Sequence, residues 1–208
     1  MSRFEAAGRR SPRALRWAAP LLFLAGAVSM TQGGWIYLKA GLAQLLIERS
    51  WERGRQGGEA PPPWPWADTH PLARLAAPRL GEEIFVLAGS SGRTLAFGPG
   101  HVAGTAVPGA YGNSVVGGHR DTHFSFLEDL RLGDALVVET PLGETRTYRV
   151  RDLRTVDHRD TGPLQSTDRR QLTLITCYPF DALAPGGPLR WVVTAVEGQE
   201  ASVGELGR

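Results

Sequence analysis

The stretch Leu172-Thr173-Leu174-Ile175-Thr176-Cys177 is a β-rich run that ends in the one cysteine of the 208-residue chain. β-Branched and aliphatic residues favour a pleated strand. Tyr178-Pro179 ends the run, because proline has no amide hydrogen to donate to a neighbouring strand. A single cysteine cannot form a disulfide within the chain. Cys177 is therefore either a small apolar core residue or a reactive thiol.

Further short β-like runs surround this strand, and turns rich in glycine, proline and aspartate separate them. Together with the first, these runs span residues 83–88, 94–97, 113–118, 135–140, 144–156, 171–176 and 189–196. Within the same region only residues 124–132 indicate a short helical turn. Residues 70–208 suffice for one domain with a substantial core. The pattern predicts an all-β barrel or sandwich.

The amino-terminal region carries a membrane signal. Residues 17–38 contain no charge over 22 positions, close to the ~20 residues that a helix needs to cross a bilayer. Five arginines and one acid precede them in residues 1–16, which by the positive-inside rule predicts a cytoplasmic amino terminus. We expect a basic cytoplasmic tail at 1–16, a transmembrane anchor at 17–38 and an extracytoplasmic remainder. The alternative is a cleaved signal peptide, since Ala25-Gly26-Ala27 resembles a cleavage site.

Residues 39–69 join this anchor to the predicted domain. Apolar residues within 40–55 recur with the spacing of an amphipathic helix. Residues 57–66 then form a stiff proline-rich spacer, because each proline fixes its φ angle and lacks an amide donor. Trp64 and Trp66 in this spacer dock either on the domain or on lipid.

The charge of the chain gives no sign of nucleic-acid binding. The chain has 23 basic and 21 acidic residues and a net charge of +2. The excess of positive charge belongs to the amino-terminal tail, which leaves the remainder without a basic face. We therefore expect no nucleic-acid partner.

Two residues can supply what a nucleophilic cysteine needs. A thiolate is favoured by a nearby imidazole or cation, and acyl transfer also needs a donor to the developing oxyanion. His119 follows a strand that ends in two glycines, which allow close backbone approach. Arg190 opens the last apolar strand, where its charge would be costly inside a barrel and so faces a groove. Outside the cytoplasm, an unpaired cysteine favours the reactive interpretation of Cys177.

Three motifs at these positions resemble the sortases, cysteine transpeptidases that join secreted proteins to the cell envelope. The motifs are Gly112-Asn113-Ser114-Val115-Val116-Gly117-Gly118-His119-Arg120, Thr173-Leu174-Ile175-Thr176-Cys177 and Leu189-Arg190-Trp191-Val192. Their order matches the family, with 58 residues from His119 to Cys177 and 13 from Cys177 to Arg190. Residues 97–109 also resemble the segment before the histidine strand. The resemblance covers residues 80–197 and is greatest to the proteobacterial group called class GN, because of the sequence Thr-Cys-Tyr-Pro-Phe.

The resemblance implies a closed eight-stranded barrel with Cys177, His119 and Arg190 at one end of a groove, on a single-pass protein of the bacterial inner membrane. It implies that Cys177 attacks a carboxyl-terminal sorting signal of a secreted protein, forms a thioester and passes the acyl group to an amine acceptor of the envelope. His119 would transfer protons, and Arg190 would bind the substrate backbone or the oxyanion. Further candidates for substrate or oxyanion binding are Thr176, Asp121, His123 and Tyr178.

We expect no metal and no cofactor. His119 and His123 have the spacing of two zinc ligands on a helix. However, Arg120 stands where the metalloprotease motif needs glutamate, and His119 follows a strand rather than opening a helix. The acidic residues show no spacing typical of calcium ligands.

Two other classes of function stay open at the level of sequence. One is another envelope enzyme with a reactive thiol, such as a cysteine peptidase or an L,D-transpeptidase that acts on peptidoglycan. The other is a catalytically silent scaffold that keeps the barrel and binds a peptide in its groove.

Overall fold

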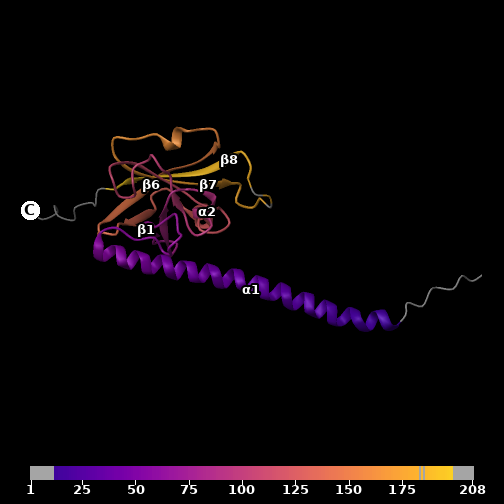
Figure 1. The fold of residues 1–208 in the computed structure, drawn as a ribbon. Coiled ribbons are helices and arrows are strands. Elements are labelled where there is room, and N and C mark those ends of the chain that lie inside the picture. The colour runs from indigo at the N-terminus through magenta and orange to yellow at the C-terminus, as the bar shows by residue number, and fades with distance from the viewer. Residues whose placement is uncertain (1–11, 183, 185, 199–208) are drawn as a thin grey trace, which may run out of the picture. The chain divides into compact units, whose positions relative to one another are not determined.

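A closed barrel of eight strands forms the body of the computed structural model, which describes residues 12–182, 184 and 186–198 (Figure 1). The strands are β1 (Pro71–Ala77), β2 (Glu82–Ala88), β3 (Gly100–His101), β4 (Gly112–Gly117), β5 (Ala135–Glu139), β6 (Thr145–Asp157), β7 (Arg170–Tyr178) and β8 (Leu189–Glu197). The helices are α1 (Pro12–Gly57), the short α2 (Gly92–Leu95) and the 3-10 turns η1 (Ser125–Asp129) and η2 (Gly162–Leu164).

The strands follow one another around the barrel in the order β1-β2-β3-β4-β7-β8-β6-β5. The pairs β2–β3 and β4–β7 are parallel, and the other six neighbouring pairs in the described barrel are antiparallel. The all-β fold class and the closed eight-stranded barrel are therefore confirmed.

The barrel interior is apolar because alternate residues of each strand point inward. Val116 of β4, Leu172 and Leu174 of β7, and Val193 and Ala195 of β8 all belong to the buried core. The residues between them on these three strands therefore lie on the outer face. That outer face carries the site described below.

The predicted strands agree with the structure in six of the seven runs and differ in one. Residues 94–97 are not a strand, so that prediction is wrong. The Ser91 hydroxyl accepts a hydrogen bond from the amide of Thr94 at 3.2 Å, which caps the start of α2 in the manner typical of serine. The helical turn predicted at 124–132 is confirmed as η1.

Sequence reasoning missed two strands, β1 and β3. In β1 every second residue is buried, but the sequence Pro-Leu-Ala-Arg-Leu-Ala-Ala consists largely of residues with high helix propensity. Its tertiary partners β2 and β5 hold it extended. β3 has two residues, too few for any periodicity.

Helix α1 confirms the helix predicted at 40–55 and also includes residues 17–38. Residues 1–11 of the predicted cytoplasmic tail lie outside the described residues. Most side chains of the predicted anchor at 17–38 lie outside the described residues, and among those that are described no helix combines the length and apolarity that a membrane crossing requires. The chain divides into two compact units, one ending at Leu42 and one beginning at Ala43 that contains the barrel.

The last turns of α1 pack into the unit that contains the barrel. Ile47 and Trp51 are completely or almost completely buried, at 0% and 1% exposure. The rings of Trp51 and Phe85 of β2 lie 5.7 Å apart. The hydroxyl of Ser50 donates to the carbonyl of Pro61. These contacts tie the helix to the proline-rich spacer and to the barrel.

The two tryptophans of the spacer have different surroundings. The ring of Trp64 lies 5.1 Å from that of Phe97 in an edge-on contact, so Trp64 docks on the domain. The side chain of Trp66 is 80% exposed.

We expect the Trp51→Ala variant to lower the free energy of unfolding by about 3–5 kcal/mol, because it removes a fully buried ring and leaves a cavity. The matched Trp66→Ala variant should change it by less than ~0.5 kcal/mol, since its side chain faces solvent. Urea denaturation of the whole chain measures both. Equal effects of the two substitutions would contradict the packing of α1 on the barrel.

Candidate active site

Cys177 and Arg190 are direct neighbours across the β7–β8 pair. The antiparallel register sets Cys177 opposite Arg190, Ile175 opposite Val192 and Thr173 opposite Thr194. Side chains of residues that are directly opposite lie on the same face of a sheet, with Cβ atoms ~5 Å apart. Cys177 and Arg190 are both half-buried. The thiol and the guanidinium thus project from the same edge of the outer face.

His119 reaches the same end of the barrel because β4 and β7 run parallel. Gly117 is the register partner of Ile175, and the amide of Gly118 donates to the carbonyl of Ile175 at 3.1 Å. His119 comes one residue later and is exposed. Parallel neighbours end at the same edge of a sheet. The register therefore brings His119, Cys177 and Arg190 together.

Arg190 is held by the chain segment that precedes it. Its Nη1 donates to the carbonyls of Gly187 at 2.9 Å and Leu189 at 2.8 Å. No hydrogen bond from Nε or Nη2 occurs within the described residues. Because a guanidinium carries five N–H donors, these remaining donors are free to bind another group.

Thr176 and Tyr178 flank Cys177 and support the strand ends around it. The Thr176 hydroxyl donates to the carbonyl of Gly118 at 2.8 Å, which fastens the end of β4 to β7. The ring of Tyr178 stacks on Trp191 with centroids 5.8 Å apart and planes 23° apart. Both side chains hold the strand ends in place.

Asp121 and His123 lie in the turn after His119. Asp121 is exposed and, among the described residues, makes no hydrogen bond to His119. His123 is half-buried, and burial lowers its pKa below the usual value, with the nearby charge of His119 acting in the same direction. A lowered pKa favours the neutral imidazole. His123 therefore adds little positive charge beside His119 near neutral pH.

Asn113, at the other end of β4, stabilises the fold around the site through its side-chain hydrogen bonds, and sequence reasoning did not single it out. It is 2% exposed. Its Nδ2 donates to the carbonyls of Pro163 and Gln165, both at 2.9 Å, and its Oδ1 accepts from the Thr173 hydroxyl at 2.7 Å. Asn113 thus pins the connection between β6 and β7 across the outer face of the barrel. A buried side-chain amide needs such hydrogen-bond partners. Its partners here are main-chain carbonyls about 50 residues away, which no local sequence pattern predicts.

The outer face is open beside Cys177. A side chain at Gly117 would meet no atom within 4 Å of its Cβ. Gly117 is the register neighbour of Ile175, two residues before the cysteine. The face is therefore covered at the Asn113 end and accessible at the Cys177 end.

No cluster of metal ligands occurs in the described residues, where no three histidine, cysteine, aspartate or glutamate side chains are grouped to hold an ion. The free thiol of Cys177 is half-buried. At this edge the register of β4, β7 and β8 gathers a thiol, an imidazole and a guanidinium.

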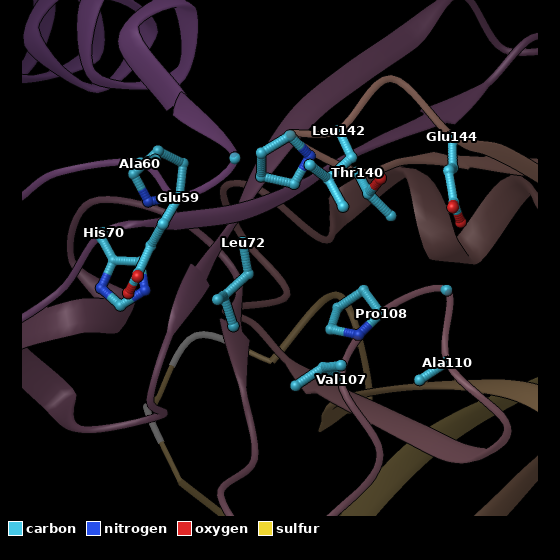
Figure 2. Close-up of a pocket in the computed structure, with 14 residues that line it drawn as sticks. Glu59, Ala60, His70, Leu72, Val107, Pro108, Ala110, Thr140, Leu142 and Glu144 are labelled. Atoms are coloured by element: carbon cyan, nitrogen blue, oxygen red, sulfur yellow. The ribbon is translucent and has the colours of Figure 1, made fainter. Parts of the chain in front are cut away.

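A cavity of about 460 Å³ lies away from these residues (Figure 2). Leu72, Pro108 and Leu142 contribute to its apolar lining, and Glu59, His70 and Glu144 also border it. Its lining includes Ala110, which comes just before the start of β4, whereas His119 follows the end of that strand. The cavity therefore lies at the opposite end of β4 from the thiol.

The chain is thus a β-barrel protein that carries a thiol, an imidazole and a guanidinium at one edge of a closed eight-stranded barrel. The family model of the sortase domain matches residues 75–197. Sortase D of Bacillus subtilis (strain 168) is 32% identical over 120 residues, which make up 57% of this chain and 60% of that protein. The chain thus spans about 60% of the length of this curated relative.

Two solved structures share the barrel. Sortase A from Corynebacterium diphtheriae gives a TM-score of 0.58 at 28% identity, covering 67% of this chain and 66% of that one. A sortase D5 transpeptidase from Clostridium perfringens gives a TM-score of 0.60 at 21% identity, covering 76% of this chain and 96% of that one. The second likeness concerns the fold alone.

The chain belongs to the sortase family, because the family's domain occupies more than half of it.

We expect the Gly118→Ala variant to lower the free energy of unfolding by about 1–3 kcal/mol, the usual cost of overpacking. Its Cβ would lie 2.6 Å from the ring of Phe124, which is completely buried, so the segment that carries His119 must shift. The Gly117→Ala variant should stay within ~0.5 kcal/mol, because its Cβ meets open space. Chemical denaturation of both variants tests this. A Gly117→Ala variant that is as unstable as Gly118→Ala would contradict the register of β4.

Proposed function

We propose that the protein is a cysteine transpeptidase that cleaves the carboxyl-terminal sorting signal of a secreted protein and joins the new end to an amine acceptor of the cell envelope. One observation carries the proposal. The register of β4, β7 and β8 sets Arg190 opposite Cys177 and brings the segment of His119 to the same edge. Membership in the sortase family supports it.

In the first step the Cys177 thiolate attacks the carbonyl carbon of a threonine or similar residue in the signal. A tetrahedral intermediate forms, and His119 donates a proton to the leaving amine as the carbon–nitrogen bond breaks. The products are a thioester on Cys177 and the released tail of the signal.

In the second step the acceptor amine attacks the thioester. His119 takes a proton from this amine, a new amide bond forms, and Cys177 leaves as thiolate. The enzyme returns to its starting state without any oxidant, reductant or metal.

Arg190 stabilises the negative oxygen or holds the substrate backbone. Nε and Nη2 are available for this, because the hydrogen bonds to the carbonyls of Gly187 and Leu189 use Nη1. Donors that are already oriented before the reaction stabilise developing charge most effectively. The bonds to the two carbonyls supply that orientation.

We place the protein in the class GN subgroup of the family. The support is the sequence Thr176-Cys177-Tyr178-Pro179-Phe180 around the nucleophile. In the structure Tyr178 and Phe180, which follow Cys177, form an aromatic cluster with Trp191 of β8, and the Tyr178 and Phe180 centroids lie 6.2 Å apart.

The test of this function is intact-mass analysis of the whole chain incubated with a peptide library that has a fixed threonine and randomised flanking positions. We expect a mass increase equal to the amino-terminal peptide fragment, and its loss on addition of an amine. Cys177→Ala should abolish the adduct. His119→Ala and Arg190→Ala should lower its rate of formation by about 100-fold or more, the usual cost of losing a proton donor or an oxyanion donor.

Three results would contradict the proposal. An adduct on Cys177→Ala would place the nucleophile elsewhere. Cross-linked muropeptides as products, with no reaction of protein-derived peptides, would favour an L,D-transpeptidase. A wild-type Cys177 that resists iodoacetamide in the folded chain and forms no adduct would favour a silent peptide-binding scaffold.

The same proposal includes attachment to the membrane through residues 17–38, with residues 1–16 in the cytoplasm. Its support is the uncharged 22-residue segment and the arginines before it. We expect the chain to remain with bacterial inner membranes after an alkaline carbonate wash, and a variant that lacks residues 17–38 to be released. Release of the wild-type chain by the wash would contradict an integral anchor.

A further inference from the structure

Arg120 directly follows His119, and its side chain is held at a place far away in the sequence. Its Nη2 donates to the carbonyls of Ala182 and Ala184, both at 2.8 Å. These two residues belong to the connection between β7 and β8, which leads from Cys177 to Arg190. One guanidinium therefore joins the segment of His119 to the segment between the other two site residues.

The environment of Arg120 is unusual for a charged side chain, because only 8% of it is exposed. None of the ion pairs between described residues includes Arg120. A buried charge needs polar partners; the two carbonyl oxygens supply them for Nη2, whereas Nη1 is buried without a hydrogen-bond partner among the described residues. The two hydrogens on one planar nitrogen reach two acceptors at once, which an ammonium on a flexible stem does less well.

Arg120 binds the connection between β7 and β8 near its middle, at Ala182 and Ala184. The connection's backbone bond from the Ala182 amide to the Pro179 carbonyl measures 3.5 Å, longer than an ordinary hydrogen bond. At its start, Phe180 packs edge-on against Tyr178 and Trp191. At its end, Arg190 holds the carbonyl of Gly187. Arg120 holds the stretch between these two anchors.

We propose that Arg120 is a positioning residue for the transfer reaction, an inference that rests on the proposed function. By binding Ala182 and Ala184, it fixes the separation between His119 and the pair of Cys177 and Arg190. It contacts neither the substrate nor the thiol in this role. It acts through the two chain segments that it joins.

Acyl transfer is sensitive to this separation. Reacting groups must lie within ~3–3.5 Å of one another, and a displacement of about 1 Å that starts away from the chemistry can cost a factor of ~100 in rate. The segment of His119 is already fastened to β7 through Gly118 and Thr176. The β7–β8 connection gains the equivalent restraint from Arg120.

The experiment compares wild type, Arg120→Ala and Arg120→Lys as whole chains, with Arg149→Ala as the matched control. Arg149 also donates to a loop carbonyl, that of Gly133 at 3.3 Å, but it is exposed and lies on β6 away from the site. Four quantities are measured: amide hydrogen exchange in residues 179–188, the denaturation midpoint, and the kcat and KM of thioester formation with the peptide selected from the library.

We expect Arg120→Ala to raise exchange in residues 179–188 by at least tenfold while the denaturation midpoint and the exchange of β7 stay close to wild type. The kcat of thioester formation should fall by about 10–100-fold, with KM changed by less than about threefold. Arg120→Lys should recover part of the loss, because its ammonium can still bind one carbonyl. Arg149→Ala should match wild type.

Unchanged exchange in residues 179–188 would overturn the inference, and so would a loss of rate that only follows a lower denaturation midpoint. Full recovery by Arg120→Lys would count against the paired carbonyl contact, because a lysine ammonium reaches two acceptors at once less well. If no peptide acylates wild type, the proposed function fails. Hydrogen exchange still decides whether Arg120 holds the connection, because it needs no substrate.

Discussion

The parallel pairing of β4 with β7 is the constraint on which the site depends. Parallel strands end at the same edge of a sheet, so the segment of His119 after β4 reaches the edge at which Cys177 lies near the end of β7. The antiparallel partner β8 then starts at that edge, which sets Arg190 opposite Cys177. The register thus brings a thiol, an imidazole and a guanidinium from three segments that are distant in sequence to the same edge of the barrel.

The surrounding contacts preserve this pairing. Inside the barrel, Val116, Leu172 and Leu174 fill the core on the opposite face of the same strands. Because side chains alternate along a strand, a shift of register by one residue would expose these apolar groups and bury the site residues. The hydrophobic core and the position of the thiol are therefore fixed by the same register.

Much of this arrangement could be predicted from sequence. The runs around Val115, Leu174 and Val193 have strong β character, and the resemblance that the three motifs carry implies the family's closed eight-stranded barrel. β1 was missed because its alanines and leucines favour helix, and only its partners in the barrel hold it extended. The sequence alone places the end of α1 in the segment that joins the predicted anchor to the domain. In the structure, Trp51 of this helix is buried in the unit that contains the barrel.

The supporting contacts of the site were beyond prediction for a different reason. Asn113 and Arg120 bind carbonyls between 50 and 64 residues away. Every residue offers a carbonyl, so such a partner leaves no signal in the identity of the residues that supply it. Only the folded arrangement shows which ones are used.

Because Asn113 and Arg120 bind main-chain carbonyls, the contacts that hold the two connections do not depend on the side chains of those connections. Asn113 holds the connection before β7, and Arg120 holds the connection after it, each through main-chain oxygens. The side chains of both connections are then free to change, since their replacement leaves the anchoring oxygens in place. A library that randomises these side chains while keeping β4 constant would vary the surface of the two connections without loosening the frame that carries the thiol.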